Sequence, residues 1–389
     1  MNNDPHTRKG QSGTARAVLF CTLGYPPGVT GGAERQAQLQ AEALTRLGLI
    51  VEVVCPRRPG TRSGSFRGIH VYRLPFIDQR PFRTASYVVA LFMFLLFRGR
   101  RYQMFHVHLA YFQADVVVIA AGVVRRPVWV KIAASGRLGE IARMAPLARF
   151  THNVGLRHAT TLQALSPDIA AELTILGVPP TRIVRIPNGV DVSVYKPGRP
   201  AARTELRRAL DLPADGTIVL FAGRFARHKG IGDLLKAWSS IDLPDAWLVL
   251  VGSNETLDPE GLIEGLPGVI VRGWTEDLLS YYRAVDAFVL PSHIEGMSNV
   301  VLEAMACGLP VIATRIGAAS ELISDGNNGL LINVHSSHDL ARALKRLLGD
   351  EALRGQLGRE ARRTIVASYA IEAVIAKIET EYRRIWANN

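Results

Sequence analysis

Short apolar runs alternate with longer amphipathic segments along most of the chain. The apolar runs are rich in β-branched residues and have the length of buried strands, whereas the segments between them have helical spacing. Strands that alternate with helices pair in parallel and are covered on both faces, so the pattern predicts a doubly wound α/β architecture. The expected strands are 17–21, 51–55, 69–74, 104–109, 128–133, 160–165, 217–222, 246–252, 269–273, 287–290 and 309–313, and three expected helices are 33–47, 299–306 and 372–389.

The length of the chain requires more than one core. At 389 residues it fits two domains of ordinary size, and the second half repeats the strand-helix pattern of the first. A Pro- and Gly-rich stretch at 195–200 has linker composition. We therefore expect a first domain at 1–190, a second domain at 191–370 and a final helical segment at 371–389.

The stretch 291–333 contains the densest group of candidate site residues. The expected strand 287–290 stops at Pro291, a polar loop follows, and a helix capped by Ser298 or Asn299 begins next. The positive end of that helix would point into the crevice at the carboxyl ends of the strands, where it favours an anion such as a phosphate. Glu295 and Glu303 frame this point as acceptors for sugar hydroxyls, unless the segment is only a capped helix with two solvated glutamates.

Three other features place polar groups at expected strand ends. Arg224 and Lys229 follow the strand 217–222 and could neutralise a diphosphate, although a solvated basic loop is the plain alternative. In the strand 104–109, His106 and His108 share one face, and His108 lies nearer the carboxyl end; a core histidine is the alternative there. The glycine-rich loop 24–32 allows close backbone approach to a ligand but lacks the spacing of a dinucleotide fingerprint.

The stretch 291–333 resembles the signature of the retaining glycosyltransferases of family 4. That signature is Glu-x7-Glu, a small-residue helix, Gly-x-Pro-Val-Ile and a later Glu, which here are Glu295, Glu303, 308–312 and Glu321. Gly-Arg at 223–224, followed by Lys-Gly at 229–230, resembles the family's second signature. Many members have Glu-Gly-Phe-Gly where this chain has Glu-Gly-Met-Ser, a variant common among surface-polysaccharide enzymes that leaves the donor sugar open.

The resemblance implies a GT-B fold, in which two doubly wound domains face each other, the first binds the acceptor, the second binds the donor, and the last helix crosses back to the first domain. It also implies transfer with retention of configuration, no cofactor and no metal. The residues that it implicates are His108, Arg224, Lys229 and Glu295 for catalysis; Gly31, Gly32, Arg224, Lys229, Gly296, Met297, Ser298, Asn299 and Glu303, together with Glu34, for the donor; and Gly252, Arg272 and Trp274 for the nucleobase.

No metal site is expected from the linear sequence. No Asp-x-Asp pair occurs, and no His, Cys or Asp cluster has ligand spacing. Cys21, Cys55 and Cys307 lie far apart in apolar segments, as reduced core residues of a cytoplasmic protein would.

The positive charge is concentrated in the first half. Residues 1–190 carry 24 Lys and Arg against 9 Asp and Glu, whereas residues 191–389 carry 22 against 25, so one half is expected to meet an anionic surface. The arginines lack a stripe with interleaved aromatics, which argues against nucleic acid. The uncharged run 84–97 lies between Arg80 and Arg83 on one side and Arg98, Arg100 and Arg101 on the other. It is too short to span a bilayer and predicts either a segment at the membrane interface or a buried helix.

These features together predict a hexosyltransferase that moves sugar from a nucleoside-diphosphate sugar to a lipid-linked or polysaccharide acceptor in bacterial surface glycan synthesis. No signal peptide is evident, so the expected location is cytoplasmic, at the inner face of the membrane. A non-catalytic nucleotide-sugar or glycan binding protein is one alternative. A nicotinamide-dependent oxidoreductase is another, and the missing glycine fingerprint argues against it.

Overall fold

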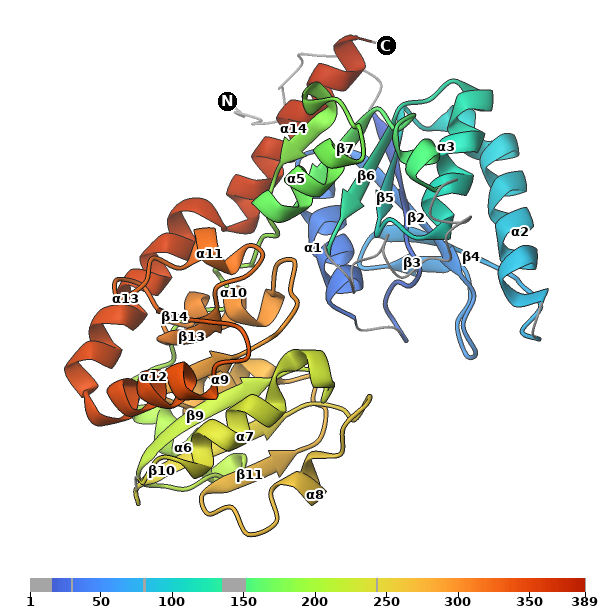
Figure 1. Cartoon of the computed structure of the whole chain (residues 1–389). Coiled ribbons are helices and arrows are strands. Elements are labelled where there is room, and N and C mark those ends of the chain that lie inside the picture. Colours follow the sequence, from blue (N-terminus) through green and yellow to red (C-terminus); the bar gives the residue numbers. More distant parts are fainter. Residues whose placement is uncertain (1–15, 29–30, 80–81, 135–151, 243, 389) are drawn as a thin grey trace, which may run out of the picture.

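The computed structural model describes residues 16–28, 31–79, 82–134, 152–242 and 244–388. Two α/β domains lie side by side, each with helices on both faces of a central sheet (Figure 1). The first sheet has the strand order β3-β4-β2-β1-β5-β6-β7-β8 and the second has the order β11-β10-β9-β12-β13-β14. Every neighbouring pair is parallel except β3 with β4. The predicted pair of doubly wound domains is confirmed.

The elements of the first domain are β1 (Ala17–Cys21), α1 (Gly32–Arg46), β2 (Ile50–Pro56), β3 (Gly64–Phe66), β4 (Ile69–Leu74), α2 (Phe82–Arg98), β5 (Met104–His108), α3 (Phe112–Val124), β6 (Val128–Ile132), β7 (Thr161–Ala164), α5 (Pro167–Ile175) and β8 (Ile183–Arg185). Those of the second are α6 (Arg203–Ala209), β9 (Thr217–Ala222), α7 (Ile231–Ser239), β10 (Ala246–Val251), α8 (Pro259–Leu262), β11 (Val269–Arg272), α9 (Leu278–Ala284), β12 (Ala287–Leu290), α10 (Asn299–Ala306), β13 (Val311–Thr314), α11 (Ala319–Leu322), β14 (Leu330–Ile332), α12 (Ser337–Gly349) and α13 (Glu351–Ser368). The last helix is α14 (Ile371–Ala387).

Most of the expected strands form with bounds within one residue of those expected. The clearest difference is β13, which begins at Val311 and not at residue 309. Gly308 adopts a left-handed backbone, and the amide of Leu309 still bonds to the carbonyl of Ala304, so these two residues complete the end of α10. The short strands β3, β8 and β14 were not expected.

The last helix leaves the second domain and packs on the first (Figure 1). Its apolar face, which includes Ile371, Ile378 and Tyr382, is buried in one cluster with Phe20 and Trp129. The hydroxyl of Tyr382 also shares a hydrogen bond with Nδ1 of the buried His106. The end of the chain is therefore part of the core of the first domain.

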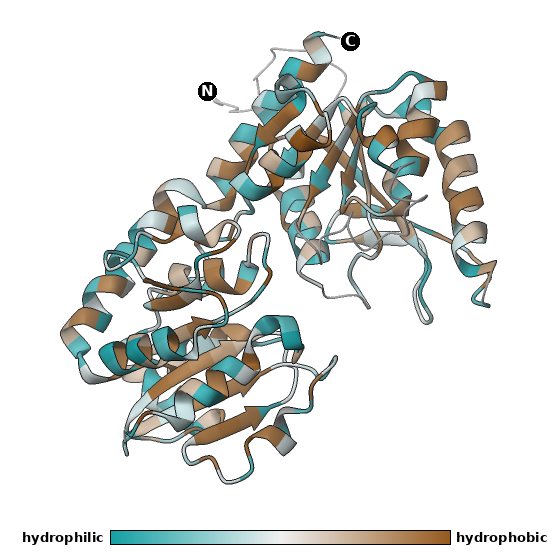
Figure 2. Ribbon diagram, viewed as in Figure 1, coloured by the Kyte–Doolittle hydropathy of each residue, from teal (hydrophilic) through white to brown (hydrophobic). Residues whose placement is uncertain are grey.

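Helix α2 contains the uncharged run 84–97, for which the sequence leaves a membrane-interface segment and a buried helix open, and it is buried along one face only. Tyr87, Leu91 and Leu95 pack inward, whereas Val89, Met93 and Phe97 are exposed. Figure 2 shows that most of the helix is hydrophobic. With the turn that follows it, this helix covers Phe82–Arg101 and is long and apolar enough to cross a membrane, although it packs against α3 at the side of the domain. Of the residues expected to flank it, Arg80 lies outside the described residues.

We expect Tyr382→Phe to lower the free energy of unfolding by about 1–3 kcal/mol, because it removes a hydrogen-bond partner from a fully buried histidine. Thr380 lies on the exposed face of the same helix, so Thr380→Ala should change the stability by less than about 0.5 kcal/mol. Urea unfolding of both variants measures the difference. Equal stability of Tyr382→Phe and the wild type would show that the bond to His106 contributes nothing.

Candidate active site

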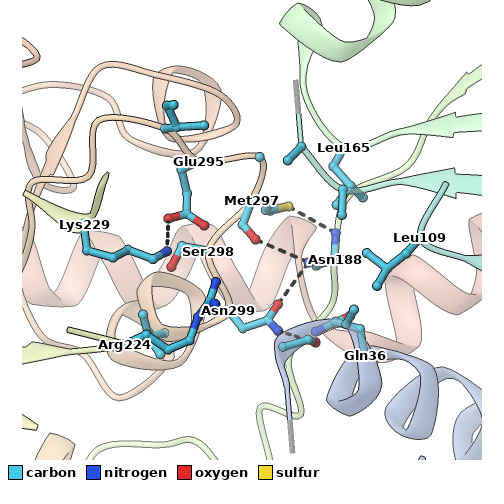
Figure 3. Close-up of a pocket in the computed structure, with 18 of the residues that line it drawn as sticks. Gln36, Leu109, Leu165, Asn188, Arg224, Lys229, Glu295, Met297, Ser298 and Asn299 are labelled. Carbon is cyan, nitrogen blue, oxygen red and sulfur yellow. Dashed lines mark hydrogen bonds and ion pairs between the residues drawn. The ribbon is translucent and has the colours of Figure 1, made fainter. Parts of the chain in front are cut away.

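A cleft with a volume of 360 Å³ lies between the two domains at the carboxyl ends of their central strands. Both domains contribute side chains to it, and Figure 3 shows them converging. The polar and charged residues that line it are Gln36, His108, Lys131 and Asn188 from the first domain and Arg224, His228, Lys229, Glu295, Ser298 and Asn299 from the second. The structure thus brings together four residues predicted as catalytic, namely His108, Arg224, Lys229 and Glu295.

An ion pair holds the main cation of the cleft. Nζ of Lys229 lies 2.6 Å from Oε2 of Glu295, and the two side chains are 15% and 20% exposed. Gly230 allows this placement: its backbone is left-handed, and a Cβ there would lie 1.9 Å from the carbonyl oxygen of Pro291. Arg224 is more exposed and pairs with Glu255. Both cations therefore have carboxylate partners that an anionic ligand would have to displace.

The start of α10 opens into the cleft without a side-chain cap, so the predicted capping by Ser298 or Asn299 is wrong. The side chain of Asn299 is used elsewhere: its Nδ2 donates to the carbonyl of Gly32 at 2.8 Å, and its Oδ1 accepts from Asn188 at 3.0 Å. Ser298, Asn299 and Val300 line the cleft at this point. The first turn of the helix and its dipole are therefore placed to bind an anion.

A polar chain that the sequence did not reveal links the domains across the cleft (Figure 3). Lys131 Nζ donates to the side-chain Oδ1 of Asn188 at 2.7 Å, and the backbone amide of Asn188 donates to the sulfur of Met297 at 3.1 Å. Lys131 is buried in the middle of β6, and a cation inside an apolar strand needs a polar partner. A lysine inside an apolar strand was the one feature of the sequence that could have indicated this polar chain.

His108 is one of the buried polar residues that line the cleft from the first domain. Its ring stacks on His106 with centroids 4.3 Å apart, and neither of its nitrogens has a hydrogen-bond partner within the described residues. Burial lowers the pKa of His108 well below its usual value, and His106 and Lys131 lower it further. The ring is therefore neutral near pH 7, so it has one nitrogen that can donate a hydrogen bond and one that can accept a hydrogen bond.

Gly296 belongs to the wall of the cleft because only a glycine fits between the domains. A Cβ at Gly296 would lie 1.6 Å from the carbonyl oxygen of Ala133 in the first domain. Gly317 braces the same loop from behind, and the amide of Ala318 donates to the carbonyl of Gly296 at 2.8 Å. The loop that carries Glu295 is therefore fixed from both sides.

Glu303 lies outside this cleft, in an adjoining hollow of 370 Å³ that shares Gln36 and Asn299 with it. Oε2 of Glu303 accepts a hydrogen bond from Tyr282 at 3.0 Å, and Oε1 lies 3.8 Å from Arg35. Burial raises the pKa of Glu303 above its usual value, although Arg35 opposes this. Its placement beside the helix start was expected, and its role toward a donor stays a prediction.

The residues predicted to form a nucleobase wall do not line the cleft. Trp274 is 54% exposed, and Arg272 donates to the backbone and carboxylate of Asp211. Gly252 has a packing role, since a Cβ there would lie 1.8 Å from the carbonyl oxygen of Gly223.

Four further predicted residues, Gly31, Gly32, Glu34 and Glu321, lie at or beyond the rim of the cleft. Gly32 lines it, whereas Gly31 precedes α1 and packs against the carboxylate of Glu34. Glu321 pairs with Arg185 of the first domain and faces a different hollow.

Within the described part of the chain, three side chains that could hold a metal ion come together, although no cluster with ligand spacing occurs in the linear sequence. They are Asp233, His293 and His335, and their ligand atoms all lie within 4.8 Å of one another. None of the three lines the cleft. They were missed because more than forty residues separate each from the next along the chain. The three cysteines, by contrast, are buried and unpaired.

Two family models match the chain, one for each domain. The model described as Glycosyl transferase 4-like domain matches residues 31–189, and the model described as Glycosyl transferases group 1 matches residues 202–364. The two facing doubly wound domains have the arrangement of the GT-B fold, and both family models describe glycosyltransferase domains. The chain belongs to the group 1 glycosyltransferases.

Curated relatives and solved structures agree with this assignment. The lipopolysaccharide core biosynthesis glycosyltransferase LpsE of Rhizobium meliloti is 35% identical over 172 residues, which cover 43% of this chain and 50% of that protein. The D-inositol 3-phosphate glycosyltransferase of an Arthrobacter species is 38% identical over 216 residues, covering 52% of this chain and 51% of that protein. The chain thus spans about half the length of the curated relatives that it matches.

Among solved structures, sucrose-phosphate synthase from Thermosynechococcus elongatus has a TM-score of 0.79 at 24% identity, covering 96% of this chain and 100% of that one. Anabaena Alr3699/HepE in complex with UDP-glucose has a TM-score of 0.78 at 21% identity, covering 95% of this chain and 99% of that one. At these identities the likeness establishes the shared fold.

Proposed function

We propose that the protein transfers a hexose-type sugar from a nucleoside-diphosphate sugar to a lipid-linked or polysaccharide acceptor in bacterial surface glycan synthesis. The observation that carries the proposal is the convergence of Arg224, Lys229 and the uncapped start of α10 on one cleft that also holds Glu295. Two cations and a helix dipole are suited to a diphosphate, and a carboxylate beside them is suited to sugar hydroxyls. The name of the relative LpsE supports the link to surface glycans.

In the proposed reaction, the bond between the anomeric carbon and the diphosphate oxygen breaks while a bond from the acceptor oxygen forms on the same face of the sugar. The leaving phosphate takes the proton of the acceptor hydroxyl. Lys229 and Arg224 stabilise the negative charge that grows on the diphosphate, a task that a metal ion performs elsewhere. The neutral ring of His108 contacts the sugar or the acceptor from the first domain.

A nicotinamide-dependent oxidoreductase is disfavoured by the missing glycine fingerprint and by the family to which the chain belongs. A protein that only binds nucleotide sugars would also place cations at the diphosphate, so Arg224 and Lys229 do not separate binding from catalysis. The match of both domains to glycosyltransferase family models favours catalysis. Catalysis is therefore the better proposal.

We expect Arg224→Ala and Lys229→Ala each to reduce kcat by about 10²–10³-fold, because each removes a charge that acts mainly as the bond to the sugar breaks. The matched control is Arg227→Ala, since Arg227 lies in the same segment but does not line the cleft. The assay measures sugar transfer or donor hydrolysis with UDP-, GDP- and ADP-sugars. Unchanged turnover in both cleft variants would contradict the assignment of the diphosphate site.

We expect the product to keep the anomeric configuration of the donor and turnover to persist in EDTA. Retention follows from attack on the face that the leaving group occupies, and metal independence follows from the protein cations at the diphosphate. Nuclear magnetic resonance of the product at early times reports the anomer. An inverted product would exclude the proposed mechanism, and loss of activity in EDTA that Mg²⁺ restores would exclude metal-free transfer.

We also propose that the first domain binds the cytoplasmic face of an anionic membrane, which would bring the cleft to a lipid-linked acceptor. The supporting surface is the apolar stripe formed by the exposed residues Val89, Met93 and Phe97 of α2 and Ile119 and Val123 of α3. Arg100, Arg101, Arg125 and Arg126 gather where these helices end, and a side-chain nitrogen of Arg126 donates to the carbonyl of Arg100 at 2.8 Å. An apolar stripe with basic residues beside it is typical of interfacial binding.

Phe97→Asp should weaken binding to anionic vesicles by roughly tenfold or more, because it replaces an apolar side chain that is 79% exposed with a charge that anionic lipid repels. Ile175→Asp is the control: Ile175 is 85% exposed but lies on α5, away from the stripe. Flotation with anionic and neutral vesicles at low salt measures binding. Two outcomes would refute the electrostatic model. One is that Phe97→Asp floats as well as Ile175→Asp, and the other is that the wild type binds neutral vesicles as strongly as anionic ones.

A further inference from the structure

We propose that Asp233, His293 and His335 form a binding site for a divalent transition-metal ion such as Zn²⁺, separate from the proposed donor site. The residues come from the first turn of α7, the loop after β12 and the loop after β14. The proposal stands on the geometry of these three side chains and does not depend on the reaction in the cleft.

Both imidazoles are turned toward the same carboxylate oxygen. Nε2 of His293 lies 2.7 Å from Oδ2 of Asp233, and Nδ1 of His335 lies 3.9 Å from the same atom. The two rings are close, with centroids 3.9 Å apart and planes at 53°. A hydrogen bond explains the first contact, but 3.9 Å is too long for one and leaves the approach of His335 unexplained.

Metal coordination accounts for all three positions. Two ligands bound tetrahedrally to Zn²⁺ at 2.0–2.1 Å are about 3.3 Å apart, which lies between the shorter and the longer separations observed here. His335 has a left-handed backbone (φ 60°), which brings its ring over His293 from a loop. Small rotations of the side chains would bring the three ligand atoms to the spacing that one ion requires.

The chemistry of the ligands selects the class of ion. Two imidazoles and one carboxylate suit Zn²⁺ and its neighbours Co²⁺ and Ni²⁺, whereas Mg²⁺ and Ca²⁺ prefer oxygen ligands. The side chain of His335 is 68% exposed, so the site is open and water can complete the coordination shell.

A bound ion would stiffen the loop that carries Glu295. The amide of His293 already donates to the carbonyl of His228 at 2.8 Å, and Thr314 donates to the carbonyl of Ser292. Glu295 follows His293 by two residues and faces the cleft. The ion would fasten this loop to α7 and to the loop after β14 from behind the cleft.

Titration of the untagged full chain with Co²⁺ tests the site directly, because a four- or five-coordinate Co²⁺ ion absorbs visible light far more strongly than the hydrated ion. We expect absorption bands that one equivalent of Zn²⁺ abolishes. His335→Ala and Asp233→Asn should each weaken Co²⁺ binding by at least about tenfold. His338→Ala should bind as the wild type does, because His338 is also exposed but lies near Asp339, outside the cluster.

Hydrogen exchange gives the second measurement. Zn²⁺ should slow exchange of the backbone amides at 292–296 in the wild type and in His338→Ala, but not in His335→Ala. Absence of the bands in the wild type, or equal affinity in the His335 and His338 variants, would overturn the metal site. Sugar transfer is not the readout, so failure of this proposal leaves the proposed function untouched.

Discussion

The close contact between the two domains at Gly296 is the constraint on which the cleft depends. A backbone without a Cβ is required there, because the carbonyl of Ala133 in the first domain occupies the place of a side chain. Asn299 adds a hydrogen bond to Gly32 a few residues further on. The start of α10 is thereby placed opposite the ends of β5 and β6, which carry His108 and Lys131 of the other wall of the cleft.

The last helix links this cleft to the packing of the first domain. His108 stacks on His106, and His106 shares a hydrogen bond with Tyr382 of α14. A residue of the cleft wall is therefore supported by the helix that follows the second domain in sequence. The bridge between Val190 and Ala370 lies where the chain crosses between the domains in both directions. Helix α14 therefore contributes to the core of one domain and restrains its position relative to the other.

Local patterns were enough to predict most of the strands, because each strand depends on residues close together in sequence. The group formed by Arg224, Lys229 and Glu295 spans more than sixty residues, and it was predictable because each member follows an expected strand and belongs to a signature of the resembling family. The link from Lys131 through Asn188 to Met297 was not predictable in that way, since the partners are 57 and 109 residues apart. The same holds for Asp233, His293 and His335. Gly252 shows the opposite error, because a strand end that the family resemblance implicated in nucleobase binding has a packing role that only the neighbouring carbonyl of Gly223 reveals.

The charges of the cleft are balanced before any ligand binds. Lys229 is paired with Glu295 and Arg224 with Glu255, so an incoming diphosphate would compete with a carboxylate at each cation. Because Lys229 and Glu295 are mostly shielded from water, separating them is favourable only when a ligand offers a new polar partner to each side chain. A diphosphate sugar supplies both at once, with phosphate oxygens for the lysine and hydroxyls for the glutamate. A free phosphate supplies only the first, and the ion pair therefore favours the intact proposed donor over its parts.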